Sequence, residues 1–173
     1  MAQRQVLIEA AARRPESTAT TAAVSTVEII GRRFSAVARL LGQPKRNGQP
    51  GFVIESEYDM QQLVHALLLV HFDDVRPEDP ASRFAGASSR LDFVLKAEQV
   101  VVETKFMRES LTIKDVGAEL LTDIGRYQTH QDCHALVAIV YDPNFRISNP
   151  RELESDLTNR VGALRVVVVV AQG

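Results

Sequence analysis

The sequence has one cysteine, Cys133, and no tryptophan among its 173 residues. A single cysteine cannot form an internal disulfide, which excludes a disulfide-stabilised secreted domain and suits a reducing cytosol. No apolar stretch approaches the roughly 18 residues that a membrane-spanning helix needs. The first nine residues also lack the long apolar segment of a secretory signal. We therefore expect a cytoplasmic protein without a membrane partner.

A basic excess is absent as well. The formal net charge is −2 and the isoelectric point is near 6.1, whereas nucleic-acid-binding domains usually carry more basic than acidic residues. This composition counts mildly against a nucleic-acid partner. A bound metal ion would add local positive charge, however, and basic residues can cluster on one face. The candidates for such clusters are Lys45 with Arg46, Arg83 with Arg90, and Arg108 with Lys114.

The first 50 residues predict a helical extension. Residues 15–24 are small and polar, which predicts a linker after a short N-terminal helix. Apolar residues at helical spacing then predict a helix from Ser25 to about Gly42. Two prolines and two glycines within residues 43–51 predict a loop. We therefore divide the chain into an N-terminal helical extension and linker, residues 1–50, and a main domain, residues 51–173.

The main domain alternates predicted helices with predicted strands. Helices are expected after Ser56, with Asp59 completing a variant capping box, over residues 113–129, and after Asn149, with Pro150 in the first turn. Strands are expected at residues 90–96, 100–107, 135–141 and 166–170, and an irregular segment at 73–89. The helix over 113–129 is expected to turn five apolar residues inward: Val116, Leu120, Leu121, Ile124 and Tyr127. This order predicts an α/β fold with a central mixed sheet flanked by helices.

Two carboxylates and a lysine fall on the first two predicted strands. Glu103 and Lys105 are two residues apart, so both project from one face of the second strand. Asp92 lies on the preceding strand. Such groups are rarely buried unless they are paired or metal-bound, and together they could bind Mg²⁺ and activate water beside a phosphate. The alternative is a surface salt bridge between Glu103 and Lys105.

The register of the two strands decides whether Asp92 joins this face. In an antiparallel pair, opposed residues point to the same side. A two-residue turn at residues 97–98 would oppose Asp92 to Glu103, and one at residues 98–99 would oppose it to Lys105. A three-residue turn would send Asp92 to the other face unless a bulge corrected the register. Both two-residue turns therefore remain compatible with one shared site.

These residues resemble a known family. Residues 90–95 (RLDFVL) and 101–105 (VVETK) are similar to the PD-(D/E)xK nuclease superfamily, which has the restriction-endonuclease-like fold. The literal proline is absent, because Leu91 precedes Asp92. The similarity continues in flanking segments: Glu57–Gln61, Phe72–Glu78, Asp123–Tyr127, His130, Cys133 and Tyr141–Pro143. Over about residues 25–160 the pattern resembles the branch related to the C-terminal domain of DpnII/MboI-type restriction enzymes, common in bacterial defence and mobile-element settings.

The resemblance implies a Mg²⁺-dependent endonuclease that hydrolyses DNA phosphodiester bonds, with Mn²⁺ as a substitute ion. Asp92 and Glu103 would bind the metal together with the backbone carbonyl of Thr104. Lys105 would orient or help deprotonate the attacking water and offset charge on the phosphate. Glu57 matches an acidic residue that many members add to the metal site, although by sequence alone it fits the ordinary preference of helix starts for negative charge.

The expected partners follow from this implied activity. Double-strand cleavage with one active site per chain favours a homodimer, and a partner protein from a defence system is a further expectation. RNA is a less favoured substrate than DNA. The alternative is a non-catalytic nucleic-acid-binding or regulatory module of a larger defence complex, which the near-neutral charge and the poorly patterned N-terminus leave open. Retention of Glu57, Asp92, Glu103 and Lys105 argues against that alternative, because a degenerate site should have lost at least one of them.

Overall fold

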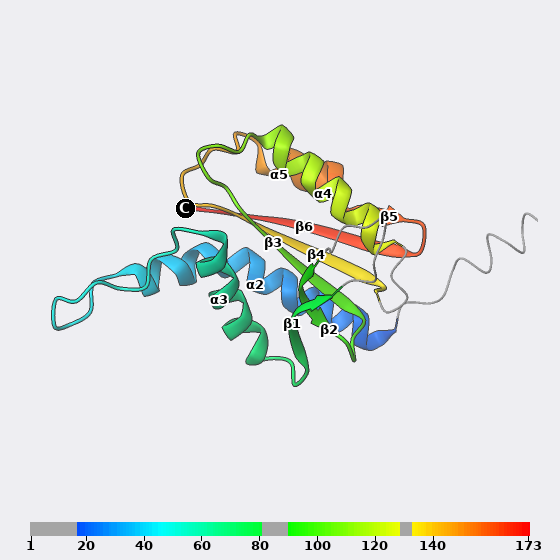
Figure 1. The fold of residues 1–173 in the computed structure, drawn as a ribbon, viewed down its shortest axis with the longest axis horizontal. Coiled ribbons are helices and arrows are strands. Elements are labelled where there is room, and N and C mark those ends of the chain that lie inside the picture. Colours follow the sequence, from blue (N-terminus) through cyan, green and yellow to red (C-terminus); the bar gives the residue numbers. More distant parts are fainter. Residues whose placement is uncertain (1–16, 81–89, 129–132) are drawn as a thin grey trace, which may run out of the picture.

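The chain folds into three layers, a mixed β-sheet between two pairs of helices (Figure 1). The structure, a computed structural model, describes residues 17–80, 90–128 and 133–173. Helices α2 (Thr18–Gly42) and α3 (Glu57–Leu69) cover one face of the sheet, and α4 (Ile113–Tyr127) and α5 (Pro150–Leu157) cover the other. This arrangement confirms the predicted α/β fold with a mixed sheet flanked by helices. Within these ranges, no helix is long and apolar enough to cross a membrane.

The sheet has six strands in the order β1-β2-β3-β4-β6-β5. Its centre is formed by β3, β4 and β6, which are parallel neighbours, whereas β1, β2 and β5 add to the two sides in antiparallel fashion. A helix connects each pair of parallel strands, as parallel neighbours require. The strands are β1 (Val75–Pro80), β2 (Arg90–Leu95), β3 (Val100–Phe106), β4 (Ala135–Asp142), β5 (Asn159–Val161) and β6 (Leu164–Gln172). The buried runs in β4 and β6 confirm the two predicted central strands.

The prediction of a linker over residues 15–24 is wrong from Thr18 onward, because α2 begins there. Ser17 caps the helix by accepting a hydrogen bond from the Thr20 backbone at 3.0 Å. Ala23 and Val24 are buried against the sheet, so small side chains carry the first part of the apolar face. The short helix predicted before this linker lies outside the described residues. A domain boundary at residue 50 stays a prediction, and α2 shares its core with β4 and β6.

Two other predictions are corrected by the sheet and by α4. Residues 75–80 were expected to be irregular, but they form β1, an edge strand where Pro77 and Pro80 are tolerated because one side of the strand needs no ladder partner. Leu121 was expected to face inward, but it is 60% exposed. The other four apolar residues of α4 are buried as predicted, and they share the inner side of the helix with Asp123.

The hairpin between β2 and β3 has the first of the two compatible registers. Phe93 opposes Val102 and Leu95 opposes Val100, which is the register of a turn centred on residues 97–98. The backbone N–H of Gln99 donates to the Lys96 carbonyl at 3.3 Å and closes this turn. The ladder ends at Phe93, and β2 continues toward Arg90 beside β1 only. The two strands therefore separate at Asp92, directly before the site.

Candidate active site

Where β2 leaves β3, the Asp92 carboxylate takes hydrogen bonds from the edge of β3 that no longer pairs with β2. Asp92 Oδ2 accepts from the Thr104 backbone N–H at 2.8 Å and from the Thr104 hydroxyl at 2.5 Å. Glu57, in the first turn of α3, lies near Phe106 of the same strand, whose backbone opposes the rise in the pKa of this carboxyl. Alternate residues of a strand direct their N–H groups to the same neighbour, so Thr104 and Phe106 face the same edge. Asp92 thus replaces the backbone partner that a longer β2 ladder would supply to Thr104.

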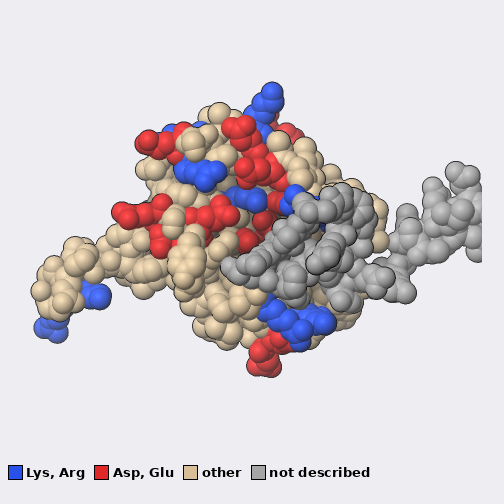
Figure 2. Space-filling model, in the orientation of Figure 1, with Lys and Arg blue, Asp and Glu red and all other residues tan. Residues whose placement is uncertain are grey.

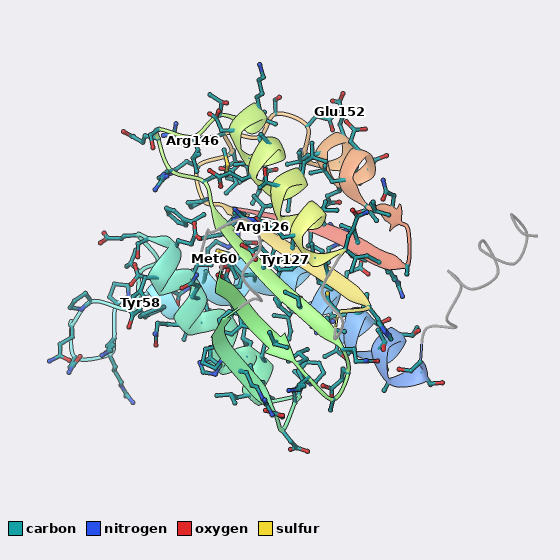
Figure 3. All side chains as sticks on the ribbon, turned by 45° about the vertical axis from the view of Figure 1, so that its right-hand side comes forward. Tyr58, Met60, Arg126, Tyr127, Arg146 and Glu152 are labelled. Carbon is teal, nitrogen blue, oxygen red and sulfur yellow. The ribbon has the colours of Figure 1, made fainter. Side chains whose placement is uncertain are left out.

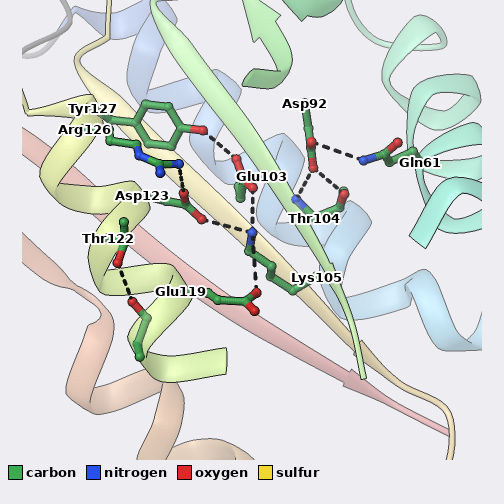
Figure 4. Close-up of polar contacts among 11 residues, drawn as sticks. Gln61, Asp92, Glu103, Thr104, Lys105, Glu119, Thr122, Asp123, Arg126 and Tyr127 are labelled. Atoms are coloured by element: carbon green, nitrogen blue, oxygen red, sulfur yellow. Dashed lines mark hydrogen bonds and ion pairs between the residues drawn. The ribbon is translucent and has the colours of Figure 1, made fainter. Parts of the chain in front are cut away.

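Gln61 fixes the second oxygen of Asp92. Its side-chain amide donates to Asp92 Oδ1 at 3.1 Å (Figure 4). Gln61 lies four residues after Glu57, so both occupy the same side of α3. The first turns of this helix are themselves fixed by Ser56, whose hydroxyl accepts from the backbone N–H of Asp59 at 3.2 Å, as predicted for its N-terminus. The cap therefore positions two side chains at the site.

Lys105 forms the centre of a second cluster, between β3 and α4. Its Nζ lies 2.9 Å from Glu103 Oε1 and 3.0 Å from Asp123 Oδ2, and Glu119 Oε2 is 4.0 Å away (Figure 4). The Tyr127 hydroxyl donates to Glu103 Oε2 at 2.6 Å. Tyr127 lies at the end of α4, on the side that faces the sheet, whereas Tyr58 stands on the outer side of α3 (Figure 3). Helix α4 thus contacts both charged members of the Glu103–Lys105 pair.

Burial excludes the surface salt bridge considered as the alternative. The side chains of Glu103, Asp123 and Lys105 are only 7%, 9% and 13% exposed. Buried charges of this kind are costly unless each has a partner. Glu119, in contrast, is 45% exposed and lies at the rim. On the face seen in Figure 2, acidic side chains surround a few basic ones.

Three carboxylates of the site, those of Glu103, Asp92 and Glu57, have raised pKa values. Burial, followed by the neighbouring charge of Asp92, raises the pKa of Glu103 to about 7. Burial also raises the pKa of Asp92, against the opposing hydrogen bonds from Thr104. The pKa of Glu57 is raised by burial, with Lys105 opposing and Asp92 adding to the shift. Burial is the largest cause of all three shifts, and a divalent cation beside these carboxylates would lower their pKa values.

The pKa of Lys105 is shifted in the direction that keeps its side chain charged. Burial alone would lower the pKa of its ammonium, but the charges of Glu103 and Asp123 outweigh burial and raise the pKa above its ordinary value. A lysine in this state is a poor proton acceptor at neutral pH. It can act as a fixed positive charge and as a hydrogen-bond donor.

The donor chemistry of the site fits a hard divalent ion, because carboxylate and carbonyl oxygens are the ligands that Mg²⁺ prefers. Across the described ranges, no three His, Cys, Asp or Glu side chains are already gathered as ligands of one ion. The reason is that Glu103 faces Lys105 and Tyr127, while Asp92 faces Thr104 and Gln61. A metal ion bound by Glu103 would therefore compete with these internal contacts for the charge of the carboxylate.

The structure places all four predicted site residues around the point where β2 and β3 separate. Glu57, Asp92, Glu103 and Lys105 are close enough to influence one another's charge. Their catalytic and metal-binding roles stay predictions. Sequence reasoning missed Gln61, Asp123 and Tyr127 as site residues, although two signals were present: Gln61 follows Glu57 by one helical turn, and Asp123 precedes Tyr127 by one turn on the buried side of α4.

Comparison with known proteins gives one family match. The model of the DpnII-MboI restriction endonuclease family, REase_DpnII-MboI, matches residues 25–173. The match begins within α2, continues past the end of β6 and so includes every residue of the site described above. No curated protein and no solved structure matches the chain.

Proposed function

The chain belongs to the DpnII-MboI family of restriction endonucleases, and from this premise we propose that it is a Mg²⁺-dependent endonuclease that hydrolyses phosphodiester bonds in DNA. One observation carries the proposal for this site. Asp92, Glu103 and Lys105 meet where β2 leaves β3, and Glu57 enters from α3. Mn²⁺ should substitute for Mg²⁺, because both ions accept carboxylate oxygens.

The proposed metal ligands are Asp92, Glu103, Glu57 and the backbone carbonyl of Thr104. The N–H of Thr104 donates to Asp92, and the N–H and C=O of one strand residue point to the same side. This relation supports the Thr104 carbonyl as a ligand beside Asp92. A bound divalent ion would lower the pKa of a water molecule and stabilise charge on the phosphate oxygens.

Lys105 is proposed to orient the attacking water and to offset the negative charge that develops on the phosphate. Preorganised donors and charges aimed at developing charge are a major source of catalysis. The raised pKa of Lys105 supports these two roles and opposes the third role considered above, proton abstraction from water. The proton of the water would then leave to another acceptor or to solvent.

We propose that the enzyme works as a homodimer in the cytoplasm, in a bacterial defence or mobile-element setting, with a defence-system protein as a further partner. The family supports DNA as the substrate over RNA. A dimer would supply the two active sites that double-strand cleavage needs. Sedimentation equilibrium across a range of protein concentrations tests the dimer, and a monomer at all concentrations would contradict it.

The experiment that tests the activity is cleavage of supercoiled plasmid with Mg²⁺, with Mn²⁺ and with EDTA. Wild type is compared with Asp92→Ala and Lys105→Ala, and with Asp74→Asn as a control that removes an exposed charge outside the site. We expect metal-dependent nicking or linearisation by wild type and Asp74→Asn, and loss of cleavage in the two site variants. Cleavage that survives in both site variants would contradict the assignment of this site.

A second candidate is a non-catalytic nucleic-acid-binding module. It is favoured by the internal contacts of the Asp92 and Glu103 side chains, whose four oxygens are all engaged within the protein. The same plasmid assay, run beside a duplex-binding assay, separates the two candidates. Binding of DNA without cleavage in either metal would favour the module.

A further inference from the structure

Lys105 is shared by two buried carboxylates that come from different layers of the fold. Glu103 lies on the same strand at 2.9 Å, and Asp123 lies on α4 at 3.0 Å from Nζ. Asp123 Oδ2 is buried and accepts no hydrogen bond of regular geometry from the part of the chain that the structure describes, and its contact with the ammonium is an ion pair. Its other oxygen lies 3.2 Å from Arg126. Asp123 thus directs one oxygen at Lys105 from the side opposite the strand.

Capping and core packing hold helix α4, and with it Asp123, in a defined position. Thr112 and Asp115 form a reciprocal capping box at its start. Val116, Leu120 and Ile124 pack into the core formed with β4 and β6. Because residues four apart share a helix face, the same packing brings Asp123 to Lys105 and the Tyr127 hydroxyl to Glu103.

If Glu103 binds a metal ion, its carboxylate interacts with two cations, the metal ion and the Lys105 ammonium. This step rests on the proposed function. Its Oε1 faces the Lys105 ammonium in the described arrangement. A carboxylate oxygen that coordinates a divalent ion attracts an ammonium group much more weakly, because the two cations compete for the same negative charge. Lys105 then needs another buried counterion, because an unpaired charge in this setting is costly. Asp123 already contacts the Lys105 ammonium and can act as this counterion.

We infer that Asp123 is a positioning residue, which holds Lys105 in place when Glu103 turns to the metal ion. Without this carboxylate, Lys105 has Glu103 as its remaining close counterion and competes with the metal for it. Neutralising Asp123 should therefore weaken metal binding and slow cleavage, even though Asp123 touches neither metal nor DNA. Glu119 gives a matched control, because it lies on the same helix and near the same ammonium, but at 4.0 Å and largely exposed.

The test measures Mn²⁺ binding by titration calorimetry and plasmid cleavage in parallel, for wild type, Asp123→Asn, Asp123→Glu and Glu119→Gln. We expect Asp123→Asn to weaken Mn²⁺ binding about fivefold or more and to lower kcat at least about tenfold with little change in KM, as loss of a transition-state interaction does. Asp123→Glu should recover part of both, and Glu119→Gln should stay within about twofold of wild type. Circular dichroism and thermal unfolding confirm that each variant is folded.

The outcomes separate this inference from the proposed function. If wild type binds Mn²⁺ but does not cleave DNA, the proposed function fails, while weaker binding by Asp123→Asn alone still supports the positioning role. Equal loss in Asp123→Asn and Glu119→Gln would overturn the inference, because removal of any nearby negative charge would then explain it. Wild-type affinity and rate in folded Asp123→Asn would overturn it as well, as would a wild type that binds no Mn²⁺.

Discussion

Asp92 accepts a hydrogen bond from the backbone N–H of Thr104 at 2.8 Å, across the gap where their two strands part. The hydroxyl of Thr104 donates to the same oxygen. One residue of β3 therefore fixes the carboxylate of β2 with two donors, in a place where the ladder itself has ended. This contact links the end of strand pairing to the geometry of the site.

Thr104→Val removes the hydroxyl donor and keeps the shape and the backbone N–H. We expect cleavage to fall about tenfold or more, since a hydrogen bond to a charged group contributes roughly 1.5 to 3 kcal/mol. Thr122→Val is the matched control, because it deletes the same group on the exposed side of α4, where it donates only to the Ala118 carbonyl. Steady-state cleavage of a plasmid measures both. Equal rates in the two variants would show that the hydroxyl of Thr104 is dispensable.

Lys105→Met removes the ammonium while retaining most of the side-chain length. Cleavage should fall by about two orders of magnitude, as after loss of a preorganised electrostatic donor. Glu103 and Asp123 would lose their shared counterion, so the free energy of unfolding should fall by roughly 3 kcal/mol or more. Cleavage is therefore compared at a temperature where circular dichroism shows both proteins folded. Lys105→Arg should not restore the full rate, because a planar guanidinium differs from a compact ammonium; full activity in Lys105→Met would remove Lys105 from the mechanism.

Glu103 makes stability depend on pH in a defined window. Its pKa is raised in the folded protein from 4.5 to about 7, so between these values the folded state binds more protons than the unfolded state. The stabilisation is thus complete below pH 4.5 and is lost as the pH rises through about 7. Glu103→Gln stays neutral at every pH, so the variant lacks this contribution to the pH dependence. The free energy of unfolding of Glu103→Gln minus that of wild type should therefore rise by up to about 3 kcal/mol from low to high pH.

Urea unfolding in EDTA at several pH values measures this change. Glu119→Gln is the control, because its carboxylate is 45% exposed and should alter the pH dependence little. Burial also raises the pKa of Glu57 and of Asp92, so Glu103→Gln should reduce the pH dependence without abolishing it. If the free energy of unfolding of Glu103→Gln changed with pH as steeply as that of wild type, Glu103 would not be a source of the pH dependence.

The loop between α2 and α3 projects from the body of the protein and carries Lys45 and Arg46 (Figure 1). These are the charged residues of segment 43–51, and the loop leads into α3, where Glu57 enters the site. If both contact phosphates, the double variant Lys45→Ala/Arg46→Ala should weaken duplex binding and lower the slope of log affinity against log salt by about 2. Fluorescence anisotropy over a salt series measures this slope.

The control for the loop is Lys96→Ala/Arg151→Ala, which removes the same charge from two exposed positions elsewhere. Lys96 lies in the β2–β3 turn, and Arg151 lies at the start of α5. This variant should keep the wild-type slope. Equal changes in the two double variants would show that general charge, and not the projecting loop, governs the affinity.

Local chemistry in the sequence determined several features of this protein. The period of two along residues 100–107 fixed Glu103 and Lys105 on one face, because successive side chains of a strand point to opposite sides. The caps at Ser56 and Asn149 set the starts of α3 and α5, since a capping side chain acts within one turn of its own helix. Continuous apolar runs marked β4 and β6 as central strands, because both faces of such strands are buried.

Only the tertiary structure decided what depends on distant segments. Residues 18–24 and β1 gave no clear local pattern, and their structure comes from packing on the sheet and from pairing with β2. The separation of β2 from β3 brought Asp92 to Thr104, and the packing of α4 brought Asp123 to Lys105. The pKa of Glu103 belongs to this level too, because burial and the charge of Asp92 both arise only when the layers close around the site. Side-chain direction along one strand is a local property, whereas contacts between layers exist only in the folded chain.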